Sequence, residues 1–318
     1  MKKSAFLLLL LPLLAGCKDS TDTPSPVESA KISLLGSVSS TVQSRGAGVI
    51  DPSASGFATT ALSLNFARID QDASTGVYPS YGSTALNATR AAGTGSTTIT
   101  FDAGSEQYYS AGTTNNASKL VGWYPRAAVA SGVVDFTFDG STDVMLSNEV
   151  AGSSSALFSE TTQAFTFNHL LTQLQFKVYA IDDAAQTSWG TITSVKVKSQ
   201  YTACSVTLPA IVSFPTTGTA SDLSVLSGAT LAMGVESANA VSVGYSMIAP
   251  VAASGSVTLE IVTSAGGTKT VTIPVPSTGF LASNAYVITL SFSNLDVTGA
   301  ASVGEWTSNA IADEVPVS

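Results

Sequence analysis

Histidine and cysteine, the side chains that carry most protein chemistry, are scarce in this sequence of 318 residues. There is one histidine, His169, and there are two cysteines, Cys17 and Cys204. A histidine-based metal site or a Ser-His-Asp triad would have to use His169, and no cluster of partners surrounds it in "FNHLL". We therefore interpret His169 as a structural core residue bonded to backbone. We predict no metal site, no cofactor and no enzymatic activity.

Acidic pairs are the other candidates for catalysis or metal binding. Asp182 and Asp183 are adjacent, and Asp139 and Asp143 lie four positions apart. Such pairs are used for calcium binding and for acid–base catalysis. The spacing lacks the repeated acids of a calcium loop, so loop acids that terminate strands are the simpler interpretation.

Two more side chains have a functional and a structural interpretation. Trp123, together with Tyr124, could stack on a sugar, but an aromatic residue on a strand usually packs in a core. Cys204 alternates with apolar neighbours in "YTACSVTL". We expect it to behave as a small buried hydrophobic residue without a disulfide partner.

The first cysteine, Cys17, follows a segment with the layout of an export signal. A basic start (Met1-Lys2-Lys3) precedes an apolar run that is too short for a membrane-spanning helix of about 20 residues. The residues Leu14-Ala15-Gly16-Cys17 resemble a bacterial lipobox. We predict that residues 1–16 are a lipoprotein signal peptide and that lipid on Cys17 holds the precursor at the outer membrane. An ordinary signal peptide with a chance cysteine is the alternative.

Composition indicates which classes of protein to exclude. The net charge is −9 and only 11% of residues are charged. Nucleic-acid binding is excluded, because phosphate contacts need clustered Lys and Arg. The 44% hydrophobic content and the frequent runs of Val, Ile, Phe and Tyr favour a folded, β-rich body over disorder.

The elements that would position these residues are mostly strands. A polar tether over 18–30 leads to a candidate strand with Ile32, Leu34 and Val38 in near alternation, and Arg45 follows in a loop of small residues. Runs in which apolar and polar residues alternate then recur along the chain. Helical periodicity is almost absent, apart from residues 168–174, which could form one helical turn or more. The expected strand-rich segments are 62–69, 119–125, 132–147, 164–180, 188–199, 256–275 and 285–297.

This succession predicts an all-β protein of sandwich type. The Ser/Ala-rich stretch at 150–163 suggests a boundary between two domains. We expect residues 46–160 to form an N-terminal β-sandwich and residues 161–318 to form a C-terminal one.

Several motifs follow one another in an order and spacing that together cover most of the chain. They are "GWYP" (122–125), "VDFTFDGSTDVMLS" (134–147), "FTFNHLLTQLQFKV" (165–178), "WGTITSVKV" (189–197), "AYVITLSF" (285–292) and "EW" (305–306). On these motifs the sequence resembles the fimbrillin family, the lipoprotein precursors of type V pilus subunits.

The resemblance implies two tandem transthyretin-like β-sandwiches and a route of assembly. An arginine-specific, trypsin-like protease would cut between Arg45 and Gly46. Residues 17–45 would then leave as a lipidated tether and propeptide, together with the strand that contains Ile32, Leu34 and Val38. Loss of that strand would open a hydrophobic groove.

The resemblance further implies that the C-terminal segment of another subunit fills this groove as a donor strand. The candidate donor is the tail 305–318. Its apolar residues are irregularly spaced, and the donor could begin as early as Leu295. The donor-strand candidates in the tail are Trp306, Ile311, Val315 and Val317.

The predicted function is therefore a structural and adhesive pilus subunit that polymerises head-to-tail and ends in the fimbrium. A host or bacterial surface ligand is compatible with this function. The alternative is a surface lipoprotein that keeps its lipid and does not polymerise, acting as a pilus anchor or as a glycan-binding module. A hydrolase is disfavoured by the single histidine.

Overall fold

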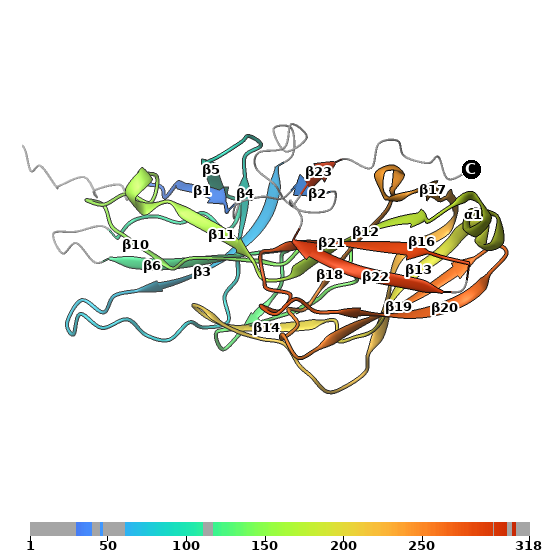
Figure 1. Cartoon of the computed structure of the whole chain (residues 1–318). Helices are drawn as coiled ribbons and strands as arrows, with labels where there is room; N and C mark the ends of the chain where they lie inside the picture. The colour runs from blue at the N-terminus through green and yellow to red at the C-terminus, as the bar shows by residue number, and fades with distance from the viewer. Residues whose placement is uncertain are drawn as a thin grey trace, which may run out of the picture.

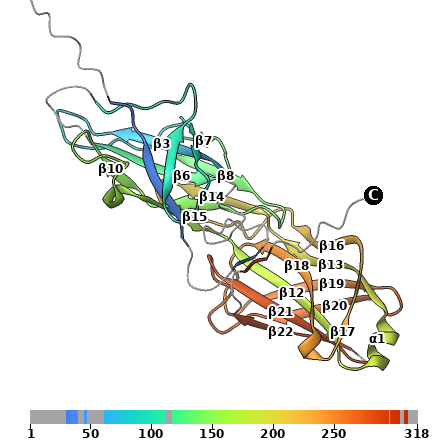
Figure 2. The same ribbon diagram turned by 90° about the horizontal axis from the view of Figure 1, so that it is seen from above.

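The computed structural model describes residues 30–39, 45–46, 61–110, 117–294, 296–303 and 307–309. The described chain is almost entirely β-structure, which confirms the predicted all-β class. Figures 1 and 2 show an elongated molecule with the early, blue-to-green strands at one end and the orange-to-red strands at the other. No helix in the described ranges is both long and apolar enough to cross a membrane.

A closed barrel occupies the blue-to-green end. Its strands pair in the order β6, β3, β4, β5, β1, β11, β9, and β9 pairs again with β6, so the ring of hydrogen bonds is complete. A further strand, β10, extends the sheet from β6. A closed barrel leaves no unpaired strand edge among its staves. The strands are β1 (Leu34–Val38), β3 (Leu62–Asp70), β4 (Leu86–Arg90), β5 (Thr97–Phe101), β6 (Ser118–Tyr124), β9 (Met145–Ser147), β10 (Val150–Gly152) and β11 (Phe165–His169).

Alternation along these strands fills the barrel with apolar side chains. Phe66 lies in the interior, and its ring meets Phe101, Phe165 and Phe167 edge-on, with centroids 5.9, 5.2 and 6.0 Å away. This edge-to-face arrangement is the one that aromatic rings prefer. The inward phenylalanines therefore come from strands that are distant in sequence and meet only because the barrel closes.

A second sheet covers the outer face of the barrel. It consists of β7 (Val129–Ala130), β8 (Val133–Thr137), β14 (Ala203–Thr207) and β15 (Ile211–Ser213), in the order β15-β14-β8-β7. A separate apolar core lies between this sheet and the barrel, with Trp123 of β6 fully buried in it. Trp123 is thus a core residue, as the structural interpretation of the sequence had it.

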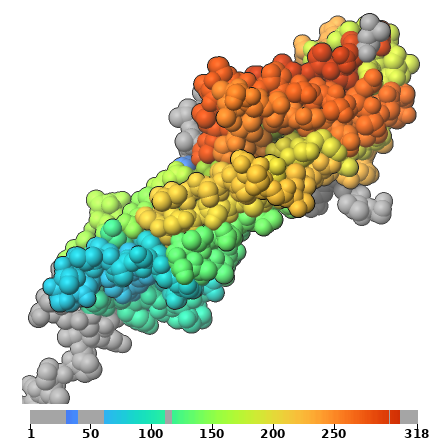
Figure 3. Space-filling view, turned by 90° about the horizontal axis from the view of Figure 1, so that it is seen from below, coloured from blue at the N-terminus to red at the C-terminus, as the bar shows by residue number. Residues whose placement is uncertain are grey.

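Strand pairing crosses the boundary expected between residues 160 and 161. After that point, β11 still pairs with β1 and β9, and β14 pairs with β8. Figure 3 shows the yellow segment that contains β14 and β15 running alongside the cyan-to-green part of the molecule. The two-sandwich division by residue number stays a prediction, but the strands themselves interleave across it.

Two further sheets face each other at the orange-to-red end around one apolar core. One has the order β17-β12-β21-β22, with β18 also paired to β12; the other has the order β16-β13-β19-β20. The expected hairpin at 256–275 is confirmed as β19–β20. The strands are β12 (Thr172–Ala180), β13 (Thr191–Gln200), β16 (Ser221–Ala232), β17 (Gly234–Val235), β18 (Val241–Ile248), β19 (Ser256–Thr263), β20 (Gly267–Pro274), β21 (Ala285–Phe292) and β22 (Val297–Val303).

The described residues contain one α-helix, and it is not where the sequence suggested a helical turn. Residues 168–174 lie at the end of β11 and the start of β12. The helix α1 (Asp183–Trp189) begins after Asp182, whose carboxylate accepts a 2.7 Å hydrogen bond from the Ala185 amide. This N-cap is the local reason for the helix. Two 3₁₀ turns span Thr161–Gln163 and Ser237–Asn239.

A small two-stranded sheet joins distant parts of the chain. In it, β2 (Arg45–Gly46) pairs in parallel with β23 (Thr307–Asn309). Figure 1 shows the two short strands together above β12 and β21. The predicted cleavage site thus lies beside a part of the predicted donor tail.

Candidate functional site

The strand that the sequence predicts to be removable is β1, and it is one of the strands that form the barrel. β1 pairs antiparallel with β5, where Leu34 lies opposite Ile99 and Gly36 opposite Thr97. On its other side β1 pairs in parallel with β11, where Gly36 lies opposite Phe165. The most N-terminal described strand is therefore central in a sheet, and without it the ring of strand pairs is broken.

Side chains from the β1 segment fill the barrel interior. Ile32, Leu34 and Val38 are exposed by only 1%, 1% and 4%. Burying aliphatic side chains of this size stabilises a fold by about 1.5–3 kcal/mol each. Three of them amount to a substantial share of the roughly 5–15 kcal/mol that holds a typical domain together. The alternation expected from the sequence is therefore the alternation that the barrel uses.

Gly36 marks the tightest point of this strand. A Cβ atom at Gly36 would lie 2.6 Å from Ile99 Cδ1 and 3.3 Å from the Phe165 carbonyl oxygen. Real Cβ atoms do not approach other atoms so closely without displacing them. The barrel thus favours a strand with no side chain at this position, and the glycine that blurred the sequence pattern fits this close packing.

A buried arginine bonds the backbone of β1. Arg90, the last residue of β4, is fully buried, and its Nε donates a 3.2 Å hydrogen bond to the Gly36 carbonyl. Its other nitrogens donate to the carbonyls of Ala91, Gly93 and Gly95 in the following loop. Burial lowers the pKa of the guanidinium, but arginine starts so far above neutral that the group stays charged. Arg90 could not be singled out from the sequence, because nothing in its neighbourhood marks it as buried.

Backbone hydrogen bonds secure the flanks of β1. The Ile32 amide donates to the Gln107 carbonyl at 2.7 Å, and the Tyr109 amide donates to the Ala30 carbonyl at 3.0 Å. The Ser39 amide continues the ladder to β11 through the Phe167 carbonyl at 2.8 Å. The segment from Ala30 to Ser39 is therefore bonded to its neighbours along its whole length.

The other predicted site residues divide into two groups. Arg45 and Gly46 form β2, six residues beyond the end of the described β1 segment. Cys17 and the predicted donor residues of the tail lie outside the described residues; these tail residues are Trp306, Ile311, Val315 and Val317.

The three arginines other than Arg45 are held by hydrogen bonds in or beside barrel strands. Arg68 of β3 bonds Asp70, Gln107, Tyr108 and Ser118. Arg126, just after β6, bonds two barrel carbonyls and Asp102, and Arg90 is fully buried. A protease that recognises an extended arginine segment would have to disrupt the barrel at any of these three.

The histidine lies in the core, as predicted, and has an acidic partner. His169 is 4% exposed, and its Nδ1 lies 2.6 Å from Oδ2 of Asp143, which is 2% exposed. Asp143 does lie in the loop before β9, but it is buried against the histidine, and that pairing could not be seen in the sequence. Asp139, in the same loop, instead accepts hydrogen bonds from Ser141 and Thr142, which lower its pKa.

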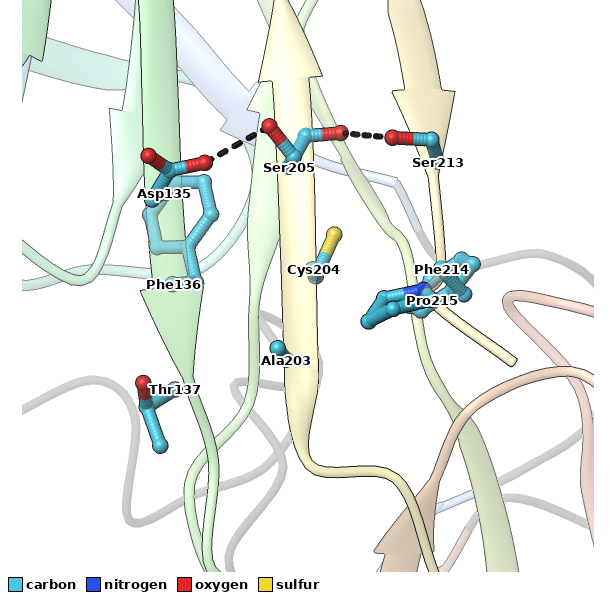
Figure 4. A pocket seen from close by; sticks show the side chains of 9 residues that line it. All are labelled: Asp135, Phe136, Thr137, Ala203, Cys204, Ser205, Ser213, Phe214 and Pro215. Carbon is cyan, nitrogen blue, oxygen red and sulfur yellow. Dashed lines mark hydrogen bonds between the residues drawn. The ribbon is translucent and has the colours of Figure 1, made fainter. Parts of the chain in front are cut away.

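A pocket of about 360 Å³ lies on the second sheet, where β8 meets β14 (Figure 4). Its polar atoms bond one another: Ser205 Oγ donates to Asp135 at 2.6 Å, and Ser213 Oγ donates to the Ser205 carbonyl at 3.3 Å. Burial raises the pKa of the Cys204 thiol to about 12, so this thiol is not an activated nucleophile. Among the described residues, no group of three His, Cys, Asp or Glu side chains could hold a metal ion.

Comparison with known proteins shows the family to which this chain belongs. The model of the fimbrillin-like family matches residues 66–306. The chain belongs to the fimbrillin-like family. This confirms the resemblance drawn from the motifs, and the match covers most of the described fimbrillin-like fold, from β3 to β22. None of the curated protein sequences matches the chain.

Solved structures share the fold of this fimbrillin-like chain at low identity. A candidate cell-adhesion protein from Bacteroides uniformis is 18% identical with a TM-score of 0.58; the alignment covers 87% of this chain and 98% of that one. A second, from Bacteroides ovatus, is 17% identical with a TM-score of 0.54 and the same coverage. A fimbrial protein from Bacteroides vulgatus is 11% identical with a TM-score of 0.48, covering 87% of this chain and 99% of its own. Family membership supports a role as a pilus subunit at the cell surface.

Proposed function

We propose that this chain is a structural fimbrial subunit that polymerises by exchanging β1 for a strand of another copy. It is exported as a lipoprotein through Cys17 and activated by a cut between Arg45 and Gly46. The observation that carries the proposal is the place of β1: it closes the barrel between β5 and β11, and its covalent connection to the following barrel strand, β3, runs through the segment that contains Arg45.

Removal of β1 would leave a defined acceptor. The edges of β5 and β11 would present unpaired N–H and C=O groups, and the space of Ile32, Leu34 and Val38 would become an apolar trough. An exposed edge beside an apolar trough is a site for strand addition. An added strand satisfies the backbone groups and fills the trough together.

Such a contact between copies builds an open filament rather than a closed oligomer. The acceptor is in the barrel, whereas the donor comes from the C-terminal segment, so the two surfaces differ and the contact is head-to-tail. Repeated addition gives a filament. The low charge content, 11% of residues, keeps electrostatic repulsion between neighbouring copies small.

The test uses an arginine-specific protease on the purified precursor. We expect a new N-terminus at Gly46 and conversion of monomers to a ladder of oligomers, seen by size-exclusion chromatography and by mass spectrometry. The variant Arg45→Ala is expected to stay monomeric. Stable monomers after a confirmed cut at Arg45 would refute the proposal and favour a lipoprotein that does not polymerise.

The matched control is Arg45→Lys. This variant keeps the positive charge but resists the arginine-specific enzyme, whereas trypsin cuts after lysine as well. Assembly should therefore fail with the first protease and return with trypsin. If Arg45→Ala assembles as fast as the unaltered chain, processing occurs elsewhere and the assignment of Arg45 is wrong.

A further inference from the structure

We infer that the donor is β22 with the two residues before it, residues 295–303, and that Gly299 of one copy takes the place of Gly36 in the barrel of the next. This inference rests on the proposed strand exchange and names the segment, its direction and its register.

The β1 segment has a simple pattern of inward-facing positions. Ile32 and Leu34 are bulky, Gly36 has no side chain, and Val38 is apolar again. The barrel favours the glycine, because a Cβ atom there would displace the tip of the Ile99 side chain and crowd the Phe165 carbonyl oxygen. The strand that best replaces β1 presents bulky, bulky, glycine and apolar residues at alternate positions.

The chain repeats this pattern once. Among its 26 glycines, only Gly36 and Gly299 have bulky apolar residues two and four positions before them and an apolar residue two positions after. For Gly299 the matching residues are Leu295, Val297 and Ala301. The tail from 305 onward contains no glycine, and Pro316 in it has no N–H to give to a ladder.

The present surroundings of β22 resemble those of β1. A Cβ atom at Gly299 would lie 2.3 Å from Ile273 Cδ1, as one at Gly36 would lie 2.6 Å from Ile99 Cδ1. In both strands, then, the glycine faces inward beneath the tip of an isoleucine. Val297, two positions earlier, is buried in β22 as Leu34 is in β1.

β22 is also the strand with fewer partners. It pairs with β21 along one side and forms the edge of its sheet, and Val297 is its only buried residue. In the barrel it would pair with both β5 and β11. Exchange therefore replaces one hydrogen-bonded ladder with two, which favours the donated position.

Arg90 is a positioning residue for the donor in this arrangement. The loop carbonyls of Ala91, Gly93 and Gly95 hold the guanidinium independently of β1. Its Nε, which bonds the Gly36 carbonyl in the precursor, would bond the carbonyl of Gly299. A buried charged donor that regains a carbonyl stabilises the matched register over one shifted by a residue.

Disulfide cross-linking tests the register and the direction. In the precursor Leu35 lies opposite Thr98 of β5, and the inferred register puts Thr298 of the donor at that position. Both threonines are exposed in the uncut chain. Directly opposite residues have the spacing that a disulfide needs, so Thr98→Cys with Thr298→Cys should link neighbouring copies after the cut.

The matched control is Thr98→Cys with Ala300→Cys. Ala300 is exposed as well, but in the inferred register it lies two residues further along the strand, beyond the reach of a disulfide. A donor running in the opposite direction would reverse this result. The natural cysteines do not interfere, because Cys17 leaves with the propeptide and the thiol of Cys204 is buried and its pKa raised.

Polymer formation is measured separately by size-exclusion chromatography under reducing conditions. Without reductant, the Thr298 pair should give at least tenfold more disulfide-linked oligomers than the Ala300 pair, and this result supports the inference. Polymers without that link, or linked through the Ala300 pair instead, refute it and leave the proposed function standing. Absence of polymers in the unaltered cut chain refutes both.

A synthetic peptide of residues 295–303 gives a second measurement that does not depend on folding of a variant. When this peptide is added in excess while the chain is being cut, it should occupy the place of β1 in the barrel and prevent the formation of oligomers. The same peptide with Gly299→Val should inhibit at least tenfold less, because its new side chain would meet Ile99 and Phe165. Equal inhibition by the two peptides would contradict the register.

Discussion

β1 and β22 are both short strands with an inward glycine beneath an isoleucine, yet they have different neighbours. β1 pairs on both sides and closes a barrel, whereas β22 pairs on one side and ends a sheet. In β1 the inward side chains are almost fully buried, but in β22 only Val297 is. Similar sequences are thus held very differently, because the neighbours of a strand determine how much backbone and apolar surface it buries.

This difference suggests why the precursor would wait for a cut. A closed barrel offers no edge to another chain, so under the proposed function β1 would protect the acceptor as long as it remains. The edge strand β22 is the easier of the two to release. The predictions below test the comparison by changing one strand and leaving the other intact.

The largest effect is expected from Leu34→Ala in β1. Removal of a fully buried leucine side chain should lower the free energy of unfolding of the uncut precursor by about 3 kcal/mol. Because β1 is then held less tightly, assembly after the cut should become faster. Urea unfolding and the rate of ladder formation measure the two changes.

The matched substitution in β22 is Val297→Ala. It should lower the free energy of unfolding of the precursor by only about 1–2 kcal/mol, because the strand lies at an edge. It should also slow assembly rather than accelerate it. The comparison breaks down if both variants change the assembly rate in the same direction.

A smaller effect is expected from Arg90→Met. The substitution removes the donors to the carbonyls of Gly36 and of the loop after β4, and buried unsatisfied acceptors should lower the free energy of unfolding by about 2 kcal/mol. Lys198→Met is the control, since Lys198 bonds acids on the surface of the other end of the molecule. A loss of stability no larger than that of the control would show that Arg90 does not hold β1.

The smallest effect sharpens the comparison from the donor side. Ala301 takes the place of the larger Val38 in the inferred register, so it fills the trough less completely. The peptide 295–303 with Ala301→Val should bind the opened barrel more tightly by about 1 kcal/mol, which is about fivefold. The concentration of each peptide that is needed to inhibit oligomer formation measures this difference in binding. Weaker binding of the valine peptide would contradict the alignment.

Much of the fold could be predicted from alternation alone. The strand at residues 31–38, the hairpin at 256–275 and the burial of Trp123 and Cys204 all follow from local pattern, because one face of each strand must be apolar. The helix α1 was missed because its single apolar turn is short, and its cap, Asp182, resembled a loop acid. The pair of His169 and Asp143 was missed because the two residues come from a strand and a loop 26 positions apart.

The sequence by itself determined the class of the protein: an all-β chain of the fimbrillin-like family, with low charge and one histidine. Only the tertiary structure decided that β1 closes a barrel, that a side chain at Gly36 would crowd Ile99 and Phe165, and that Arg90 bonds the Gly36 carbonyl. The reason is physical. Local alternation determines which side of a strand is buried, but the partners that bury it come from β5 and β11, which are more than 50 residues away for the first and more than 100 for the second.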